Sequence, residues 1–149
     1  MSDNVYLGNP NLKKANTPIE FTEENVIEFV KCKNDPVYFA RKYIKIVSLD
    51  EGLVPFNMYD FQEKLIDRFH KNRFNICKMP RQTGKSTTCI SYLLHYAVFN
   101  DNVNIAVLAN KASTARDLLG RLQLAYENLP SWMQQGIISW NKGSLELEN

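Results

Sequence analysis

The residues whose chemistry is easiest to interpret form a run at positions 79–87, MPRQTGKST. Gly84 can adopt a backbone conformation that side chains disfavour, Lys85 can reach phosphate oxygens, and the Ser86 hydroxyl can ligate Mg²⁺. A loop that leads into a helix also directs free backbone N–H groups at one point, where they favour an anion. The run therefore predicts a site for a nucleoside triphosphate. The predicted contacts within it are Gln82, Thr83, Gly84, Lys85, Ser86 and Thr87.

The sequence on either side of this run supports the prediction. Residues 74–78 are apolar and strand-like, and residues 87–94 have the spacing of a helix. The usual phosphate-loop pattern, GxxxxGK[ST], has a glycine where this chain has Met79, so Gly-Lys-Ser alone is a weak signal. The alternative is a simple turn at Gly84 followed by a solvated lysine at the start of a helix.

Two apolar runs, each followed by a helical pattern, predict a sheet. The run 74–78 precedes a helix that extends to about Phe99, and the run 103–109 precedes a helix that ends at Pro130. Strand, helix, strand, helix predicts a right-handed βαβ unit and an α/β fold with a parallel sheet. A short hairpin is expected between residues 137–140 and 144–148.

The first half of the chain is expected to be mainly helical. Thr22 and Asp35 suit the caps of two helices, and a third helix is expected from Asn57 to His70. Residues 50–52 are expected to form a turn and residues 54–56 an extended connector. The apolar stripe that the first helix is expected to bury comprises Val26, Ile27, Phe29 and Val30.

Composition and hydropathy limit the class of protein. The 149 residues are 44% hydrophobic, which suits one ordinary domain with a core, and the net charge of +2 neither requires nor excludes nucleic acid. No apolar run approaches ~18 residues and the N-terminus lacks a signal-peptide pattern, so we expect an intracellular protein without a membrane partner.

Cysteines, histidines and tryptophans carry weaker expectations. Cys32, Cys77 and Cys89 lack metal-ligand spacing and are expected to be buried free thiols. His70 and His95 are expected at the surface or in an interface. Trp132 and Trp140 are expected in the core or in contacts between subdomains.

Three blocks in this order resemble the large terminase subunit of tailed bacteriophages, the ATPase of the DNA-packaging motor, and most closely its T-even-like branch. The blocks are DPVYF at 35–39 with Tyr43 and Ile44, YDFQ at 59–62, and PRQTGKST at 80–87. The resemblance extends over about residues 21–149. In that family an Arg-Gln-x-Gly-Lys-[Ser/Thr] loop replaces the glycine-rich form, so Met79 agrees with the resemblance.

The resemblance implies a helicase-like P-loop ATPase that uses ATP and Mg²⁺. It implies that Gln62 recognises the adenine edge, that Ser86 ligates Mg²⁺, and that Arg81 and Lys85 are catalytic groups on the transferred phosphate. The residues themselves leave alternatives: Gln62 at a polar helix rim, and Arg81 paired with a carboxylate. An aromatic residue, Tyr59 or Phe61, either stacks on the base or fills the core.

The resemblance also implies partners and a place in the cell. These are double-stranded DNA, a portal protein, a small terminase subunit and further copies of the chain in a ring on the portal, all in the host cytoplasm. The segment 110–116 resembles a stretch that touches nucleic acid in helicase-like ATPases, although a solvated loop fits equally well. Its suitable donors are Lys111, Ser113, Thr114 and Arg116.

An ATPase of this class also needs an apolar strand that ends in acidic residues for Mg²⁺ and water. The run 103–109 ends at Asn110, and residues 145–149 alternate polar and apolar side chains. We therefore expect an N-terminal fragment of a large terminase, without the nuclease domain, that contacts nucleotide but does not hydrolyse ATP alone. The expected organisation is a flexible arm at 1–20, a helical subdomain at 21–52 and part of the ATPase domain at 53–149. Other interpretations are another helicase-like DNA-translocating ATPase, or a nucleotide-binding module without hydrolysis.

Overall fold

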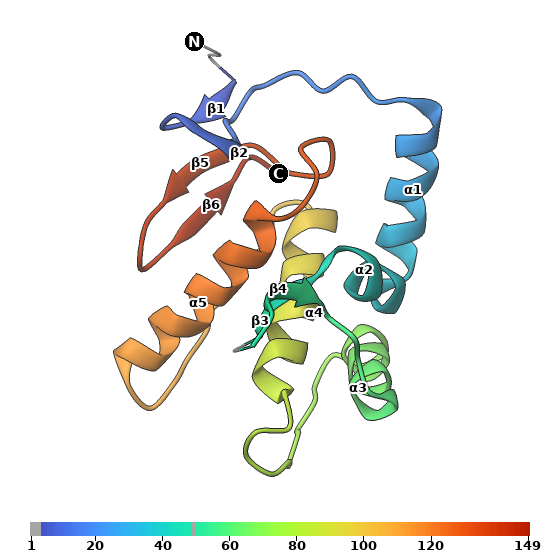
Figure 1. The fold of residues 1–149 in the computed structure, drawn as a ribbon, viewed down its shortest axis with the longest axis vertical. Coiled ribbons are helices and arrows are strands. Elements are labelled where there is room, and N and C mark those ends of the chain that lie inside the picture. The colour runs from blue at the N-terminus through green and yellow to red at the C-terminus, as the bar shows by residue number, and fades with distance from the viewer. Residues whose placement is uncertain (1–3, 49) are drawn as a thin grey trace.

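The computed structural model describes residues 4–48 and 50–149. This part of the chain is a mixed α/β structure with five helices and three antiparallel strand pairs, β1 with β2, β3 with β4 and β5 with β6 (Figure 1). The expected parallel sheet is absent from the described residues. The first three residues of the expected arm lie outside them.

The N-terminal helices begin where the sequence predicts. Helix α1 spans Glu23–Asn34, and the Thr22 side chain accepts the Asn25 N–H at 3.2 Å. Helix α2 spans Pro36–Tyr43, and Asp35 caps it by accepting the Tyr38 N–H at 2.8 Å. Both caps satisfy backbone donors that a helix start leaves free, which explains why these local signals were sufficient.

A carboxylate joins α1 to α2. Glu28 accepts hydrogen bonds from the hydroxyls of Tyr38 and Tyr43 at 3.0 and 2.9 Å, and its carboxylate is 2.7 Å from the Lys42 ammonium. Burial alone would raise the pKa of Glu28, but the hydrogen bonds from Lys42, Tyr43 and Tyr38 outweigh it, so the pKa lies below its ordinary value. The charged form of Glu28 therefore stabilises the contact between the helices.

The predicted buried stripe of α1 is wrong for three of its four residues. Val26, Ile27 and Val30 are exposed, whereas Phe29 packs edge-on against Phe99 with ring centroids 4.9 Å apart. The helix turns Cys32 and the Glu28 cluster inward instead, because the polar cluster has partners on α2. Apolar spacing predicted the helix but not which side of it would be covered.

The predicted turn and extended segment before the next helix are present as parts of a hairpin, whose strand pairing the sequence did not predict. Strand β3 (Lys45–Ser48) pairs with β4 (Gly52–Pro55), and Phe56 beyond it is buried in the core. Helix α3 then spans Asp60–Lys71, close to its predicted range.

Helix α4 (Lys85–Phe99) lies at the centre of the molecule and contacts α2, α3 and α5. Its buried side chains include His95, which is 2% exposed, so the expected surface position is wrong for His95, whereas His70 is exposed. The His95 Nε2 lies 2.9 Å from the Cys32 carbonyl oxygen, and its ring is packed among aromatic side chains. Helix α5 (Ala112–Glu127) covers one side of α4.

The two predicted strands at 74–78 and 103–109 are extended but unpaired. Neither forms a ladder with any strand in the described part of the chain, and in Figure 1 both run toward the lower end of the view. Several of their apolar side chains are exposed: Ile76 is 99% exposed and Leu108 is 86% exposed, whereas Val103 and Val107 are half-buried. An apolar run becomes a strand only where a neighbouring strand accepts its backbone groups, and here none does so.

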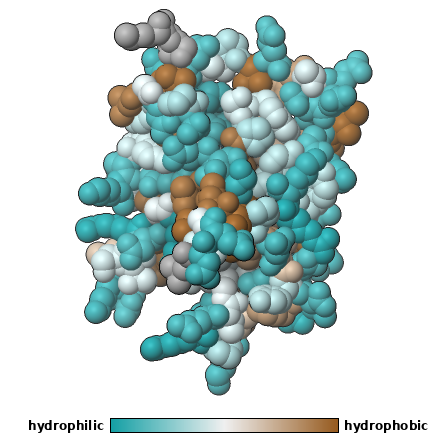
Figure 2. Space-filling model, in the orientation of Figure 1, coloured by the Kyte–Doolittle hydropathy of each residue, from teal (hydrophilic) through white to brown (hydrophobic). Residues whose placement is uncertain are grey.

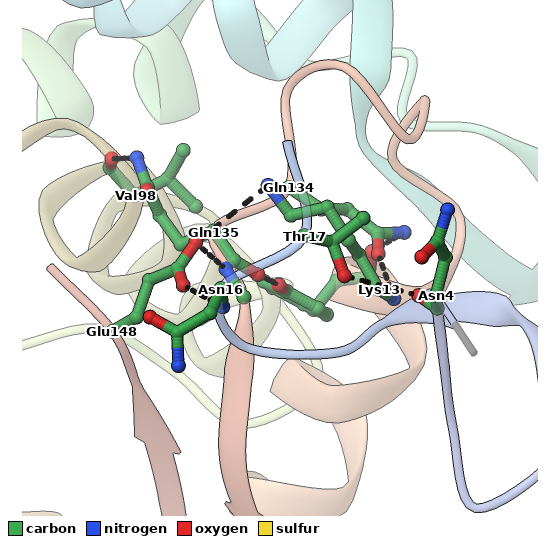
Figure 3. Close-up of polar contacts among 10 residues, drawn as sticks. Asn4, Lys13, Asn16, Thr17, Val98, Gln134, Gln135 and Glu148 are labelled. Carbon is green, nitrogen blue, oxygen red and sulfur yellow. Dashed lines mark hydrogen bonds and ion pairs between the residues drawn. The ribbon is translucent and has the colours of Figure 1, made fainter. Parts of the chain in front are cut away.

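The described part of the expected arm at 1–20 includes a hairpin that packs on residues near the C-terminus. Strands β1 (Val5–Tyr6) and β2 (Asn9–Lys13) pair with each other, and Leu12 is buried. The Lys13 N–H donates to the Gln134 side chain at 3.1 Å (Figure 3). Lys14 also forms an isolated parallel bridge with Ile137. The arm is held by residues more than 120 positions away, which no local pattern reveals.

The predicted C-terminal hairpin is confirmed, and it anchors that arm. Strand β5 (Ile137–Trp140) pairs with β6 (Leu145–Leu147). Beyond β6, Glu148 accepts the N–H group of Asn16 at 2.7 Å (Figure 3). It also accepts the N–H group of Gly136 at 2.7 Å. Gly136 has no space for a side chain, since an added Cβ would lie 2.5 Å from both the Ala15 Cα and the Glu148 carboxylate.

The tryptophans and cysteines complete the comparison with the sequence. Trp132 packs on Tyr43 and Trp140 packs on Tyr126, so the predicted core contacts are confirmed. All three cysteines are free, but only Cys32 is buried; Cys89 is half-buried and Cys77 is exposed, since the segment 74–78 is uncovered. Among the described residues, no helix has the length and apolar character needed to cross a bilayer.

Candidate phosphate-binding loop

The loop 79–87 connects the extended segment 74–78 to the first turn of α4. Gly84 is the N-cap of the helix and has φ +73° and ψ +12°, a left-handed conformation that glycine adopts without strain. No side chain caps this end of α4, and its first turn has no acidic residue. A helix start in this state has unsatisfied N–H donors and a positive dipole end, both of which favour a bound anion.

Lys85 and Thr83 fold back over the loop. The Lys85 Nζ donates to the Pro80 carbonyl at 3.1 Å, and the Thr83 hydroxyl donates to the same carbonyl at 3.0 Å. The ammonium group is thus held on the inner side of the turn, within reach of any anion bound at the helix start. The sequence predicted that Lys85 lies at a phosphate-binding site, and in the structure its side chain lies against the backbone of the loop.

Gln62 joins the loop to helix α3. Its Oε1 accepts the Tyr59 N–H at 2.9 Å, and its Nε2 donates to the Thr83 carbonyl at 3.3 Å. Gln62 is 3% exposed, so the alternative of a polar helix rim is wrong. A Cβ on residue 84 would lie 2.5 Å from Gln62 Nε2, so Gly84 is required both for its conformation and for this close approach.

Tyr59 and Phe61 form an exposed aromatic pair beside Gln62. Their rings are stacked, with centroids 5.7 Å apart and an interplanar angle of 9°. Both count among the exposed large hydrophobic residues, so neither fills the core. A flat, solvated aromatic surface next to a buried amide is suited to stacking against a planar ligand.

Arg81 and Gln82 occupy the outer part of the loop. Both side chains are exposed, and Gln82 has a positive φ of +61°. No carboxylate in the described part of the chain pairs with Arg81, so the carboxylate alternative has no support there. The guanidinium group is therefore available to an incoming phosphate.

The remaining loop residues lie at the base of the site. Ser86 and Thr87 are half-buried in the first turn of α4. Thr88, which the sequence analysis did not select, is fully buried and donates its hydroxyl to the Gly84 carbonyl at 3.0 Å. A threonine four residues after the N-cap glycine was the available signal, because its hydroxyl can bond the carbonyl one turn back.

The segment 110–116 is separate from this loop. Lys111 is the N-cap of α5 without a side-chain hydrogen bond, and Lys111, Ser113, Thr114 and Arg116 are all exposed. The larger described hollow, about 830 Å³, lies between residues 102–107, α5 and the β5–β6 hairpin, and a second of about 470 Å³ lies beside the N-terminal hairpin. Neither is lined by residues of the loop 79–87.

The charged side chains in and beside the loop are all positive. Lys78, Arg81 and Lys85 lie in or beside it, and no hydrogen bond or ion pair in the described part of the chain brings a carboxylate to residues 79–87. The site thus offers cations and N–H donors, and the Ser86 hydroxyl is an oxygen that could ligate a metal.

A scan against models of known protein families finds no match for this chain.

Proposed function

We propose that the loop 79–87 binds the phosphates of ATP together with Mg²⁺, as the phosphate loop of a P-loop ATPase. The observation that supports this proposal is the uncapped start of α4 behind a left-handed glycine, with Lys85 folded over the same turn. In this proposal Lys85 and the N–H groups hold the phosphates, and the Ser86 hydroxyl would ligate Mg²⁺. Arg81 would contact the γ-phosphate, where charge grows during transfer.

The particular protein that we propose is part of a large terminase subunit, the ATPase that packages double-stranded DNA into a phage procapsid. The support is the sequence resemblance of three blocks, two of which meet in space: YDFQ at 59–62 contacts PRQTGKST at 80–87 through Gln62. The proposed partners are double-stranded DNA, the portal protein, the small terminase subunit and further copies of the chain, in the host cytoplasm. Another helicase-like DNA-translocating ATPase is the alternative within the same class.

A nucleotide-binding module without hydrolysis is a second candidate. The observation in its favour is that no hydrogen bond or ion pair in the described part of the chain joins a carboxylate to the loop, whereas hydrolysis needs an acidic residue for Mg²⁺ and one to orient water. Detectable ATP turnover by the purified chain would contradict this candidate. Binding without turnover would support it.

Direct binding of ATP tests the proposed site. With Mg²⁺ present, calorimetry should show one ATP per chain, and Lys85→Ala should weaken binding about 10- to 100-fold because it removes a charge-assisted contact. The matched control is Lys78→Ala, a nearby exposed lysine outside the loop, which should bind as the parent chain does. Equal loss in both variants, or no binding by the parent chain, would contradict the proposal.

Two further variants separate the proposed roles. Arg81→Ala should retain ADP affinity and lose the preference for ATP over ADP, because only the γ-phosphate is proposed to contact it. Gln62→Ala should reduce the preference for ATP over GTP if the amide turns from Thr83 to the base when nucleotide binds. Unchanged discrimination by the Gln62 variant would leave Gln62 as a residue that only positions the loop.

A further inference from the structure

Helix α1 has an exposed apolar surface on the side opposite the core. Val26, Ile27 and Val30 are all exposed, and Ile27 is 70% exposed. At 100° per residue, the centre of this stripe lies roughly 165° around the helix from the buried Cys32. The stripe is therefore a second apolar side that nothing in the described part of the chain covers.

The position of α1 makes this stripe accessible. The helix lies at the periphery of the molecule (Figure 1), and Figure 2 shows a small hydrophobic patch at the edge where Figure 1 places α1. Three neighbouring aliphatic side chains on one helix face form a patch of the kind that packs against another helix.

Charged residues lie at both ends of the stripe and have opposite signs. Glu23 and Glu24 occupy the first turn, and Lys31 and Lys33 occupy the last. Lys31 already has a partner within the chain, because its Nζ lies 3.8 Å from the centre of the Tyr38 ring in a cation–π contact. Glu23 lies on the axis of the stripe and Lys33 on its border, and no ion pair in the described part of the chain uses either.

We propose that two copies of this chain associate through α1, with the helices antiparallel about a two-fold axis at residue 28. The midpoint of Glu23 and Lys33 is position 28, and the centre of the stripe is at nearly the same position. In this arrangement Val26 of one copy faces Val30 of the other, and Glu23 of each copy faces Lys33 of the second copy. In the antiparallel orientation each Glu23 thus faces an opposite charge. In the parallel orientation Glu23 would face Glu23 and Lys33 would face Lys33, and these like charges would repel.

The contact is isologous, since the same surface serves both copies, and therefore differs from the head-to-tail contact that builds a ring. Three aliphatic side chains per copy cannot bury the roughly 800 Å² per partner of a standard interface. We therefore expect a weak dimer with a dissociation constant on the order of 100 μM, strengthened by lowering the salt concentration.

Sedimentation of the whole 149-residue chain over a concentration series up to about 1 mM tests the dimer. Ile27→Asp should weaken association at least tenfold, because it places two carboxylates in the apolar centre of the contact. The control is Ile76→Asp, an equally drastic change at an exposed site away from α1, which should associate like the parent chain. A parent chain that stays monomeric, or a dimer lost only in the Ile76 variant, would overturn the proposal.

Charge exchange tests the antiparallel register. Glu23→Lys and Lys33→Glu should each weaken the dimer about 3- to 10-fold, since each replaces two attractive pairs by two repulsive ones. The double variant should restore it, although both changes oppose the helix dipole and lower the stability of α1. Glu24→Lys is the matched control, with the same charge change one residue away and off the stripe. A double variant as weak as the single variants would overturn the register.

Discussion

Lowering the pH from 7 to 5 is expected to destabilise this protein through His95. The ring is buried against Phe39 and Phe99, and burial lowers the pKa of His95 to about 4. The hydrogen bond to the Cys32 carbonyl partly opposes that effect, and the neighbouring His70 adds to it. In the neutral ring Nε2 carries the hydrogen, since a carbonyl only accepts.

The sign and size follow from the two pKa values. In the unfolded chain a histidine has a pKa of about 6.5, so between pH 6.5 and 4 the unfolded state binds a proton that the folded state does not. The free energy of unfolding therefore falls as the pH is lowered through this window. With a folded pKa of about 4, the step from pH 7 to pH 5 costs about 2 kcal/mol, and the full loss below pH 4 is about 3 kcal/mol.

Urea denaturation at pH 7, 6 and 5 measures this loss. His95→Gln keeps an amide donor for the Cys32 carbonyl but cannot titrate, so its stability should change much less with pH. His70→Gln removes an exposed histidine whose charge contributes to the lowered pKa of His95, so its stability should still fall with pH, by slightly less than in the parent chain. If the His95 variant loses as much stability as the parent chain, burial of a neutral ring is not the cause.

Two further predictions concern stability at pH 7, each measured by urea denaturation. Glu28→Gln should cost about 1–3 kcal/mol, because it leaves the half-buried hydroxyls of Tyr38 and Tyr43 and the exposed Lys42 ammonium with a neutral partner. Glu24→Gln on the exposed side of the same helix should cost almost nothing, and equal costs would contradict the role of the cluster. Gly136→Ala should cost about 1–3 kcal/mol because its Cβ meets backbone, while Gly120→Ala, which has open space inside α5, should stabilise by about 0.5–1 kcal/mol. If Gly136→Ala left the free energy of unfolding unchanged, the backbone at Ala15 would be able to move aside at little cost, which would contradict this prediction.

Local signals in the sequence were sufficient for the helices and for the candidate loop. Thr22 and Asp35 act within three residues of their partners, so their capping could be predicted without the fold. The same is true of Gly84 and Lys85 at the start of α4, where the motif and the helix are contiguous. These features depend on short-range chemistry that a sequence displays directly.

Features that depend on distant partners could not be predicted in this way. The N-terminal hairpin is polar and lacks a periodic pattern, and its order comes from residues near position 134. The segment 103–109 has the composition of a buried strand, but composition does not supply a neighbour. Gln62 was selected for a ligand, whereas its present hydrogen bonds hold Tyr59 and Thr83, a choice that only the fold determines.

The bond between Lys13 and Gln134 also sets an order of events during synthesis of the chain. The acceptor lies 121 residues after the donor, so at ~5–20 residues per second it is made roughly 6–24 s later. During this interval Leu12, which is buried in the finished fold, has no cover. The segment that contains Leu12 is thus among the last parts of this fold to be protected. Until residues 134–148 emerge from the ribosome, that segment of the nascent chain is open to proteases and chaperones.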